Sequence, residues 1–164
     1  GPFGRRRRAG AGRPGFIGST CNFMNDHTIY LAASYSRREE LCKYRDELTR
    51  RGWRVKARWL DGTHQLTPAG TTLGDAGEAL VEAGGPEAHA LRGKFATDDV
   101  EDVLDATIVI SFTGAGGRGG RHVEFGMAIA MGANLVIVGP REHIFHSLPD
   151  VLQFDTWEKC LETF

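Results

Sequence analysis

Carboxylates stand at two places in the sequence where their spacing could support chemistry. Glu124 follows a glycine-rich run, GGRGGRHVE at 116–124, and a second group, Asp98, Asp99 and Asp102, lies in FATDDVEDVLD. An ionised carboxyl group can attack as a nucleophile, and another that keeps its proton can act as an acid. Glycines let a small ligand lie against the main chain, because they carry no side chain. The combination is typical of a sugar or nucleotide site.

The scaffold that positions these groups is predicted by strands that alternate with helices. Apolar runs typical of buried strands occupy 28–33, 106–112, 133–139 and 151–154, and an alternating run occupies 53–60. Helical patterns occupy 36–51, 75–83, 87–105, 121–131 and the residues after Asp155. These patterns predict an α/β fold, namely a doubly wound, mostly parallel five-stranded sheet of the flavodoxin or Rossmann type, flanked by helices.

Capping signals predict where two of the helices begin. Ser36 with Glu39 three residues later predicts a capping box for the first helix, which Gly52 ends. Asp155 with Glu158 predicts the same arrangement for the last helix. Residues 61–86 are rich in Gly, Thr and Pro and predict a surface excursion.

The predicted sheet brings two loops to one edge. In doubly wound sheets, ligands bind beyond the carboxyl ends of the strands. The loop at 113–120 follows one central strand, and the segment 34–38 follows another. We therefore expect both loops and Glu124 to border the same cleft.

Three short motifs follow one another within residues 28–139. They are Thr28-Ile29-Tyr30, Asp99 with an aliphatic residue four positions later (Val103), and Gly120-x-x-x-Glu124-x-Gly126-x-Ala128. In order and spacing they resemble the nucleoside 2-deoxyribosyltransferase family, which includes relatives that hydrolyse deoxynucleoside 5′-monophosphates. The resemblance implies an enzyme that cleaves the N-glycosidic bond of a (deoxy)ribonucleoside or its 5′-monophosphate and passes the sugar to another nucleobase or to water.

The resemblance also implies roles for three residues. The glutamate that matches Glu124 attacks the anomeric carbon and forms a glycosyl-enzyme. The aspartate that matches Asp99 handles the proton of the departing base, and the tyrosine that matches Tyr30 holds the nucleophile by a hydrogen bond. Neighbouring negative charge raises the pKa of a carboxyl group, which suits an acid at Asp99. From the residues alone, Asp98 and Asp102 remain alternative acids.

One departure from the family pattern concerns the substrate. Arg118 stands six residues before Glu124, where the nucleoside transferases carry an aspartate that contacts the sugar. An arginine there favours an anionic 5′-group. The expected substrate-binding residues are Ser34, Ser36, Arg37, Arg118, Gly119 and Gly120. Arg37 is equally compatible with the exposed first turn of a helix.

Two other functions fit the glycine-rich run. Lysine-decarboxylase-like phosphoribohydrolases use Gly-Gly-x-Gly-Thr-x-x-Glu, although Arg121 stands at the threonine position here. A nucleotide-sensing module would keep the pocket without turnover. Without the resemblance, Glu124 could only complement a helix dipole, and Tyr30 could only be a core aromatic.

Charge is distributed unevenly and separates two regions. Residues 1–25 carry five arginines and no acid, whereas the remainder carries 15 basic and 21 acidic residues. We expect a flexible Gly/Arg-rich tail at 1–26, whose Gly-Pro start is typical of a cleaved expression tag, and one domain at 27–164. The acidic domain argues against a nucleic-acid polymer as partner.

The remaining expectations concern environment and partners. Three widely spaced cysteines predict neither a disulfide framework nor a zinc site, and they favour the cytoplasm. His143 and His146 in HIFH have a metal-like spacing, but two histidines without a third ligand are more often loop residues. We therefore expect no metal, no cofactor and no membrane partner. The partners are a small-molecule nucleoside or nucleotide and a nucleobase, and the resemblance implies a homodimer or higher homo-oligomer.

Overall fold

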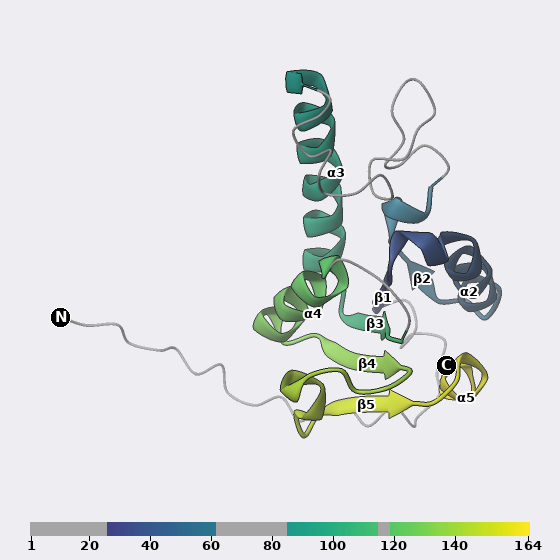
Figure 1. Cartoon of the computed structure of the whole chain (residues 1–164). Helices are drawn as coiled ribbons and strands as arrows, with labels where there is room; N and C mark the ends of the chain where they lie inside the picture. Colours follow the sequence, from purple (N-terminus) through teal and green to yellow (C-terminus); the bar gives the residue numbers. More distant parts are fainter. Residues whose placement is uncertain (1–25, 62–84, 115–118) are drawn as a thin grey trace.

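A computed structural model describes residues 26–61, 85–114 and 119–164, which form one sheet with helices around it (Figure 1). The predicted tail up to residue 25, the predicted helix at 75–83, most of the predicted surface excursion, and Arg118 lie outside the described residues. No helix among the described residues is long and apolar enough to cross a bilayer.

Five parallel strands make up the sheet. They are β1 (Thr28–Ala32), β2 (Arg54–Val55), β3 (Ile108–Phe112), β4 (Asn134–Val138) and β5 (Val151–Phe154). Their order is β2-β1-β3-β4-β5, and every pair is parallel. The order reverses direction between β1 and β3, as in flavodoxin-like doubly wound sheets. This architecture confirms the predicted fold class.

Helices cover both faces of the sheet. They are α2 (Arg38–Arg50), α3 (Gly85–Asp105), α4 (Gly120–Met131) and α5 (Trp157–Leu161), with 3-10 turns η1 (Tyr35–Arg37), η2 (Arg58–Leu60) and η4 (Ile144–Ser147). α3 and α4 pack together on one face, and α2 and α5 lie on the other, where the rings of Tyr44 and Trp157 stack at 4.5 Å (Figure 1). Each helix therefore buries an apolar side against the sheet.

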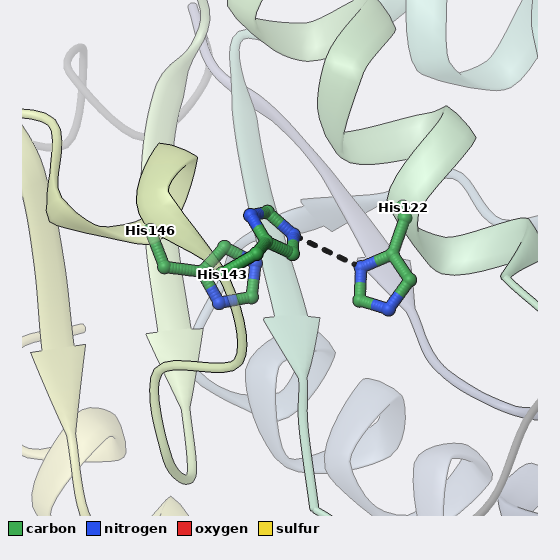
Figure 2. Close-up of side chains that lie close together, drawn as sticks. All are labelled: His122, His143 and His146. Carbon is green, nitrogen blue, oxygen red and sulfur yellow. Dashed lines mark hydrogen bonds between the residues drawn. The ribbon is translucent and has the colours of Figure 1, made fainter.

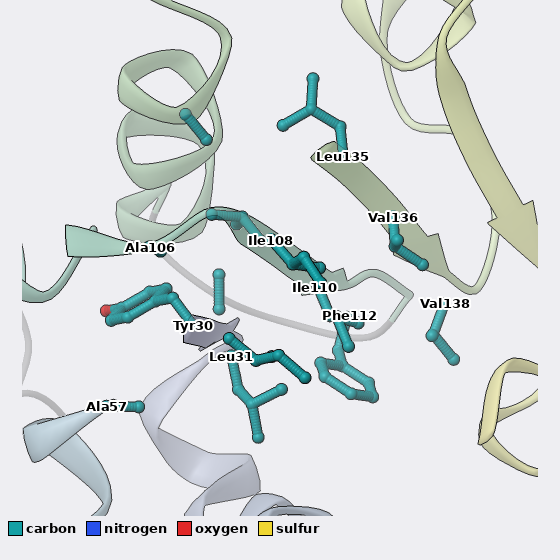
Figure 3. Close-up of a cluster of buried hydrophobic side chains, with 14 of the residues drawn as sticks. Tyr30, Leu31, Ala57, Ala106, Ile108, Ile110, Phe112, Leu135, Val136 and Val138 are labelled. Carbon is teal, nitrogen blue, oxygen red and sulfur yellow. The ribbon is translucent and has the colours of Figure 1, made fainter. Parts of the chain in front are cut away.

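The two central strands supply the middle of the core. All five residues of β1 and all five of β3 are buried, because helices cover them from both sides. Figure 3 shows Leu31, Ile110 and Phe112 packed within this cluster. Each such side chain contributes about 1.5–3 kcal/mol by leaving water. The carboxyl ends of β1 and β3 are consequently held on well-packed strands.

The prediction of a strand over 53–60 was wrong for most of its length. Only Arg54 and Val55 pair with β1. The chain then turns into η2, because the main-chain N–H of Arg58 donates to a carboxylate oxygen of Asp102 at 2.7 Å instead of to a neighbouring strand. The indole of Trp59 donates to the carbonyl of Leu31 at 2.8 Å. The Arg58 N–H and the Trp59 side chain are thus committed to bonds that an extended strand over 53–60 could not make.

Both predicted capping boxes were also wrong. Ser36 lies inside η1, and α2 begins after Arg37 without a side-chain cap. The last helix is capped by Thr156, whose hydroxyl accepts from the main-chain N–H of Lys159, rather than by Asp155. The 3-10 turn η1 takes up Ser36, so α2 begins at Arg38, two residues after the predicted cap. The predicted stop at Gly52 is confirmed, since that residue has a φ of 92°.

Candidate functional site

The carboxyl edge of the sheet brings together β1, β3 and the start of α4. Ala32 at the end of β1 pairs with Ser111 near the end of β3. α4 begins at Gly120 after Gly119, which adopts the left-handed conformation with a φ of 89°. Glu124 lies about one turn into α4, on the side that faces β1. The position is the strand-order reversal, where ligands bind in sheets of this kind.

Glu124 and Tyr30 form the centre of the candidate site. The Tyr30 hydroxyl donates to Oε1 of Glu124 at 2.8 Å, and Tyr30 itself is fully buried on β1. The other oxygen, Oε2, is buried and has no hydrogen-bond partner among the described residues. A buried carboxylate oxygen that the fold leaves without a partner marks a candidate for function rather than for stability. The hydrogen bond that the resemblance implies is therefore present.

Burial perturbs the titration of both carboxyl groups. It raises the pKa of Glu124 to about 8; the Tyr30 hydrogen bond opposes this rise, and the charge of Asp99 adds to it. Burial likewise raises the pKa of Asp99 to about 7, with contributions from Asp102 and Asp98. Because Glu124 and Asp99 repel each other when both are ionised, they titrate as a pair. Near neutrality this pair holds a proton that can be donated.

Arg58 distinguishes Asp99 from the two aspartates beside it. Its guanidinium contacts Oδ1 of Asp102 at 2.9 Å and Oδ1 of Asp98 at 3.0 Å. Asp102 is fully buried, and its second oxygen accepts from the main chain of Arg58. Asp102 therefore fastens η2 to α3. Sequence reasoning missed Arg58, because nothing in its own segment signals a partner 40 residues away.

The predicted substrate-binding residues are only partly positioned as expected. Arg37 forms a two-pronged ion pair with Glu40, both contacts being 2.8 Å, and reaches the carbonyl of Thr113 at 3.3 Å. Ser34 accepts from Arg121 at 3.2 Å, and Ser36 is exposed. Gly119 is the N-cap residue of α4, and Gly120 begins the helix. Ser34, Arg37 and the two glycines thus lie at the carboxyl edge, but Glu40 already neutralises Arg37.

A second arginine that the sequence did not single out for this purpose ties the edge together. Arg121 is buried and directs one nitrogen, Nη2, to both carboxylate oxygens of Glu142 at 2.9 Å. Glu142 also accepts from the main-chain N–H of Gly114 at 3.1 Å. Arg121 therefore joins three loops at this edge. It binds Ser34 on the loop after β1 and Glu142 on the loop after β4, and Glu142 in turn binds Gly114 on the loop after β3.

Comparisons with known proteins agree with this architecture. No protein-family model and no curated protein matches the chain. The solved structure of CMP N-glycosidase BcmB from Clostridium botulinum aligns with a TM-score of 0.51 at 17% identity, over 82% of this chain and 95% of that one. The 2-deoxyribosyltransferase of the psychrotolerant bacterium Bacillus psychrosaccharolyticus aligns with a TM-score of 0.56 at 22% identity, over 82% and 90%. At these identities the likeness establishes a common fold, and both names agree with the family that the sequence motifs resemble.

The buried carboxyl of Glu124 should cost stability as the pH rises. Its pKa lies above the ordinary value of 4.5, so the folded state binds the proton more tightly, and the free energy of unfolding falls between about pH 4.5 and pH 8. Glutamine does not titrate. Glu124→Gln should therefore raise the thermal midpoint relative to the parent chain far more at about pH 8 than at about pH 5. Differential scanning calorimetry at both pH values measures this.

Glu39→Gln is the matched control for that measurement, because Glu39 is an exposed glutamate on α2. Its effect on the midpoint should be small and similar at the two pH values. A Glu124→Gln effect that is equally pH-independent would contradict the burial of an ionisable group at this position.

Proposed function

We propose that this chain is an enzyme that cleaves the N-glycosidic bond of (deoxy)ribonucleosides or their 5′-monophosphates through a covalent glycosyl-glutamate. The observation that carries the proposal is the buried Glu124 carboxyl, bound by Tyr30 at 2.8 Å and coupled to Asp99 at the strand-order reversal. The shared fold with a CMP N-glycosidase and a 2-deoxyribosyltransferase supports it. The sugar then passes to another nucleobase or to water.

In the first step, Glu124 acts as the nucleophile. A lone pair on its Oε2 forms a bond to the anomeric carbon of the sugar while the bond from that carbon to the base nitrogen breaks. The base leaves with the electron pair and takes a proton from Asp99. Tyr30 holds Oε1 and favours the ionised form of Glu124, which the attack requires.

In the second step, the covalent intermediate is resolved. A water molecule or an incoming base gives a proton to Asp99 and attacks the anomeric carbon, and Glu124 departs as a carboxylate. Two displacements at one carbon retain its configuration, as in retaining glycosidases. The same two carboxyl groups therefore serve both halves of the reaction.

For the 5′-end of the substrate we propose binding by Ser34, Ser36, Arg37, Gly119 and Gly120, together with Arg118, which lies outside the described residues. The main-chain N–H groups at a helix N-terminus, here Gly120 after the N-cap residue Gly119, suit a phosphate. That one structural neighbour is named for CMP supports a 5′-monophosphate over a nucleoside. Since Glu40 pairs with Arg37, phosphate binding by that side chain would compete with the existing ion pair.

The alternative of a lysine-decarboxylase-like phosphoribohydrolase has less support. Arg121 stands where that pattern has threonine, and its guanidinium is bound to Glu142 and Ser34. Analysis of products after incubation with nucleosides and their monophosphates separates these reactions, and it separates both from a sensing module that releases no base.

Self-association is a further part of the proposal. Large apolar side chains are exposed on α4 and on the neighbouring η4, including Val123 at 64% and Ile144 at 80% exposure. Large exposed apolar side chains gathered on neighbouring elements are typical of an interface. We therefore propose a homodimer or higher homo-oligomer, as the resemblance implies.

Glu124→Gln should abolish base release while the fold is retained. Because a covalent catalyst loses its entire pathway, kcat/KM for a nucleoside or its monophosphate should fall by several orders of magnitude. Chromatographic measurement of free base gives the rate, and circular dichroism checks the fold. Glu39→Gln changes an exposed carboxylate on α2 that this mechanism does not use, and it should retain most activity. Comparable rates for Glu124→Gln and the parent chain would remove Glu124 from the mechanism.

The role of Asp99 as proton donor can be tested through the leaving group. Asp99→Asn should slow the release of natural bases much more than the release of a base analogue that departs without protonation. With the parent chain, kcat/KM should rise with pH as one of the two carboxyl groups ionises, and it should fall once both are ionised. The two limbs of this profile should lie around the pKa values of about 7 and about 8.

Equal slowing of both kinds of leaving group would assign Asp99 a structural role instead. Asp102→Asn is the comparison variant. Since Asp102 is bound by Arg58, it should lower stability without changing the preference between leaving groups.

A further inference from the structure

Three histidines form a cluster on the side of α4 that faces away from Tyr30. His122 comes from the first turn of α4, and His143 and His146 come from the loop around η4 (Figure 2). Each can offer one nitrogen, and the three nitrogens lie within 4.8 Å of one another. The sequence showed the spacing of His143 and His146 but not the third residue, which the topology brings in from 21 positions away.

Hydrogen bonding within the cluster is incomplete. Nε2 of His143 lies 3.2 Å from Nδ1 of His122, and Nδ1 of His146 accepts from the main-chain N–H of Glu142 at 3.1 Å. Nδ1 of His143 and Nε2 of His146 are buried and have no hydrogen-bond partner among the described residues. A buried polar atom without a partner is costly, and Nε2 of His146 is such an atom on a residue of the cluster, so it calls for a binding partner.

We propose that His122, His143 and His146 bind a divalent transition-metal ion of the Zn²⁺ type. Imidazole nitrogens are preferred ligands for such ions. Two nitrogens bound tetrahedrally at about 2.0–2.1 Å from one ion lie roughly 3.3 Å apart, which the 3.2 Å between His122 and His143 matches. His146 completes a three-histidine set. This site is independent of the proposed catalytic residues.

The surroundings of the cluster favour a metal. Nε2 of His122 lies 3.5 Å from a carboxylate oxygen of Glu142, as an outer carboxylate does when the opposite nitrogen binds metal.

Ligation by His146 requires one local change. In the structure, Nδ1 of His146 accepts from the main-chain N–H of Glu142. When Nε2 binds the ion, the imidazole proton moves to Nδ1, which can then no longer accept this bond. The Glu142 amide must then turn away. The ion would thereby fasten the first turn of α4 to the loop around η4.

A fourth coordination position has room for water or a small ligand. A cavity of about 410 Å³ adjoins the cluster and is lined by His122, Phe125, Gly126, Ile129, His143 and Phe145. Three protein ligands with an open position distinguish a reactive or exchangeable metal site from a closed structural one. The residues that line the cavity are otherwise apolar, which excludes competing protein ligands there.

Metal binding can be measured directly on the full chain. After treatment with a chelator and its removal, titration with Co²⁺ should produce visible absorption bands of a nitrogen-bound ion, and isothermal calorimetry with Zn²⁺ should show one ion per chain. Zn²⁺ should also raise the thermal midpoint of the parent chain, because it binds only the folded state.

Variants identify the ligands. His143→Ala and His122→Gln should each weaken Zn²⁺ binding by more than roughly 100-fold, because even the outer partners of a metal ligand are worth about 10- to 100-fold. His89→Gln, an exposed histidine on α3, is the matched control and should bind as the parent does. If His143→Ala fails to fold, His122→Gln still tests the proposal, because His122 is half-exposed. Absence of stoichiometric binding by the parent chain, or unchanged binding by His122→Gln, would overturn the proposal.

Discussion

The hydrogen bond between Tyr30 and Glu124 is the interaction on which the rest of the candidate site depends. It joins the central strand β1 to α4 and holds a carboxyl group in a place where burial opposes its ionisation. Burying such a group is costly unless it keeps its hydrogen bond, which needs rigid support for both partners. The fully buried strands β1 and β3 supply that rigidity, and they place Tyr30 beneath Glu124 at the edge where the strand order reverses.

Around this bond, ion pairs hold three neighbouring acids of the described residues. Arg58 binds Asp98 and Asp102, and Arg121 binds Glu142. Burial raises the pKa of both Asp99 and Glu124, and the charge of Asp99 adds to the rise at Glu124. Ion pairs on either side of the site thus serve the structure, while the coupled pair at the edge retains a proton near neutrality. That separation is what a reaction with one nucleophile and one acid requires.

Sequence patterns predicted what depends on local spacing. The apolar runs predicted β1, β3, β4 and β5, whereas the alternating run over 53–60 predicted a strand of which only Arg54 and Val55 form β2. The motifs predicted that Tyr30 and Glu124 are neighbours. Partnerships between distant residues could not be predicted in this way. Arg58 lies in a segment whose alternating pattern favours a strand, and only its bonds to Asp102 show why the strand stops. His122 joins His143 and His146 only because α4 lies beside η4.

The central claim is that Glu124 becomes covalently bonded to the sugar. Its most direct test is the mass of the intact protein after incubation with a 2′-fluoro nucleoside or its 5′-monophosphate, whose electron-withdrawing fluorine slows the second step. The account predicts a mass increase of one glycosyl group, located by peptide mapping on Glu124 and absent in Glu124→Gln. Base release without any adduct, or an adduct on another residue, would contradict it.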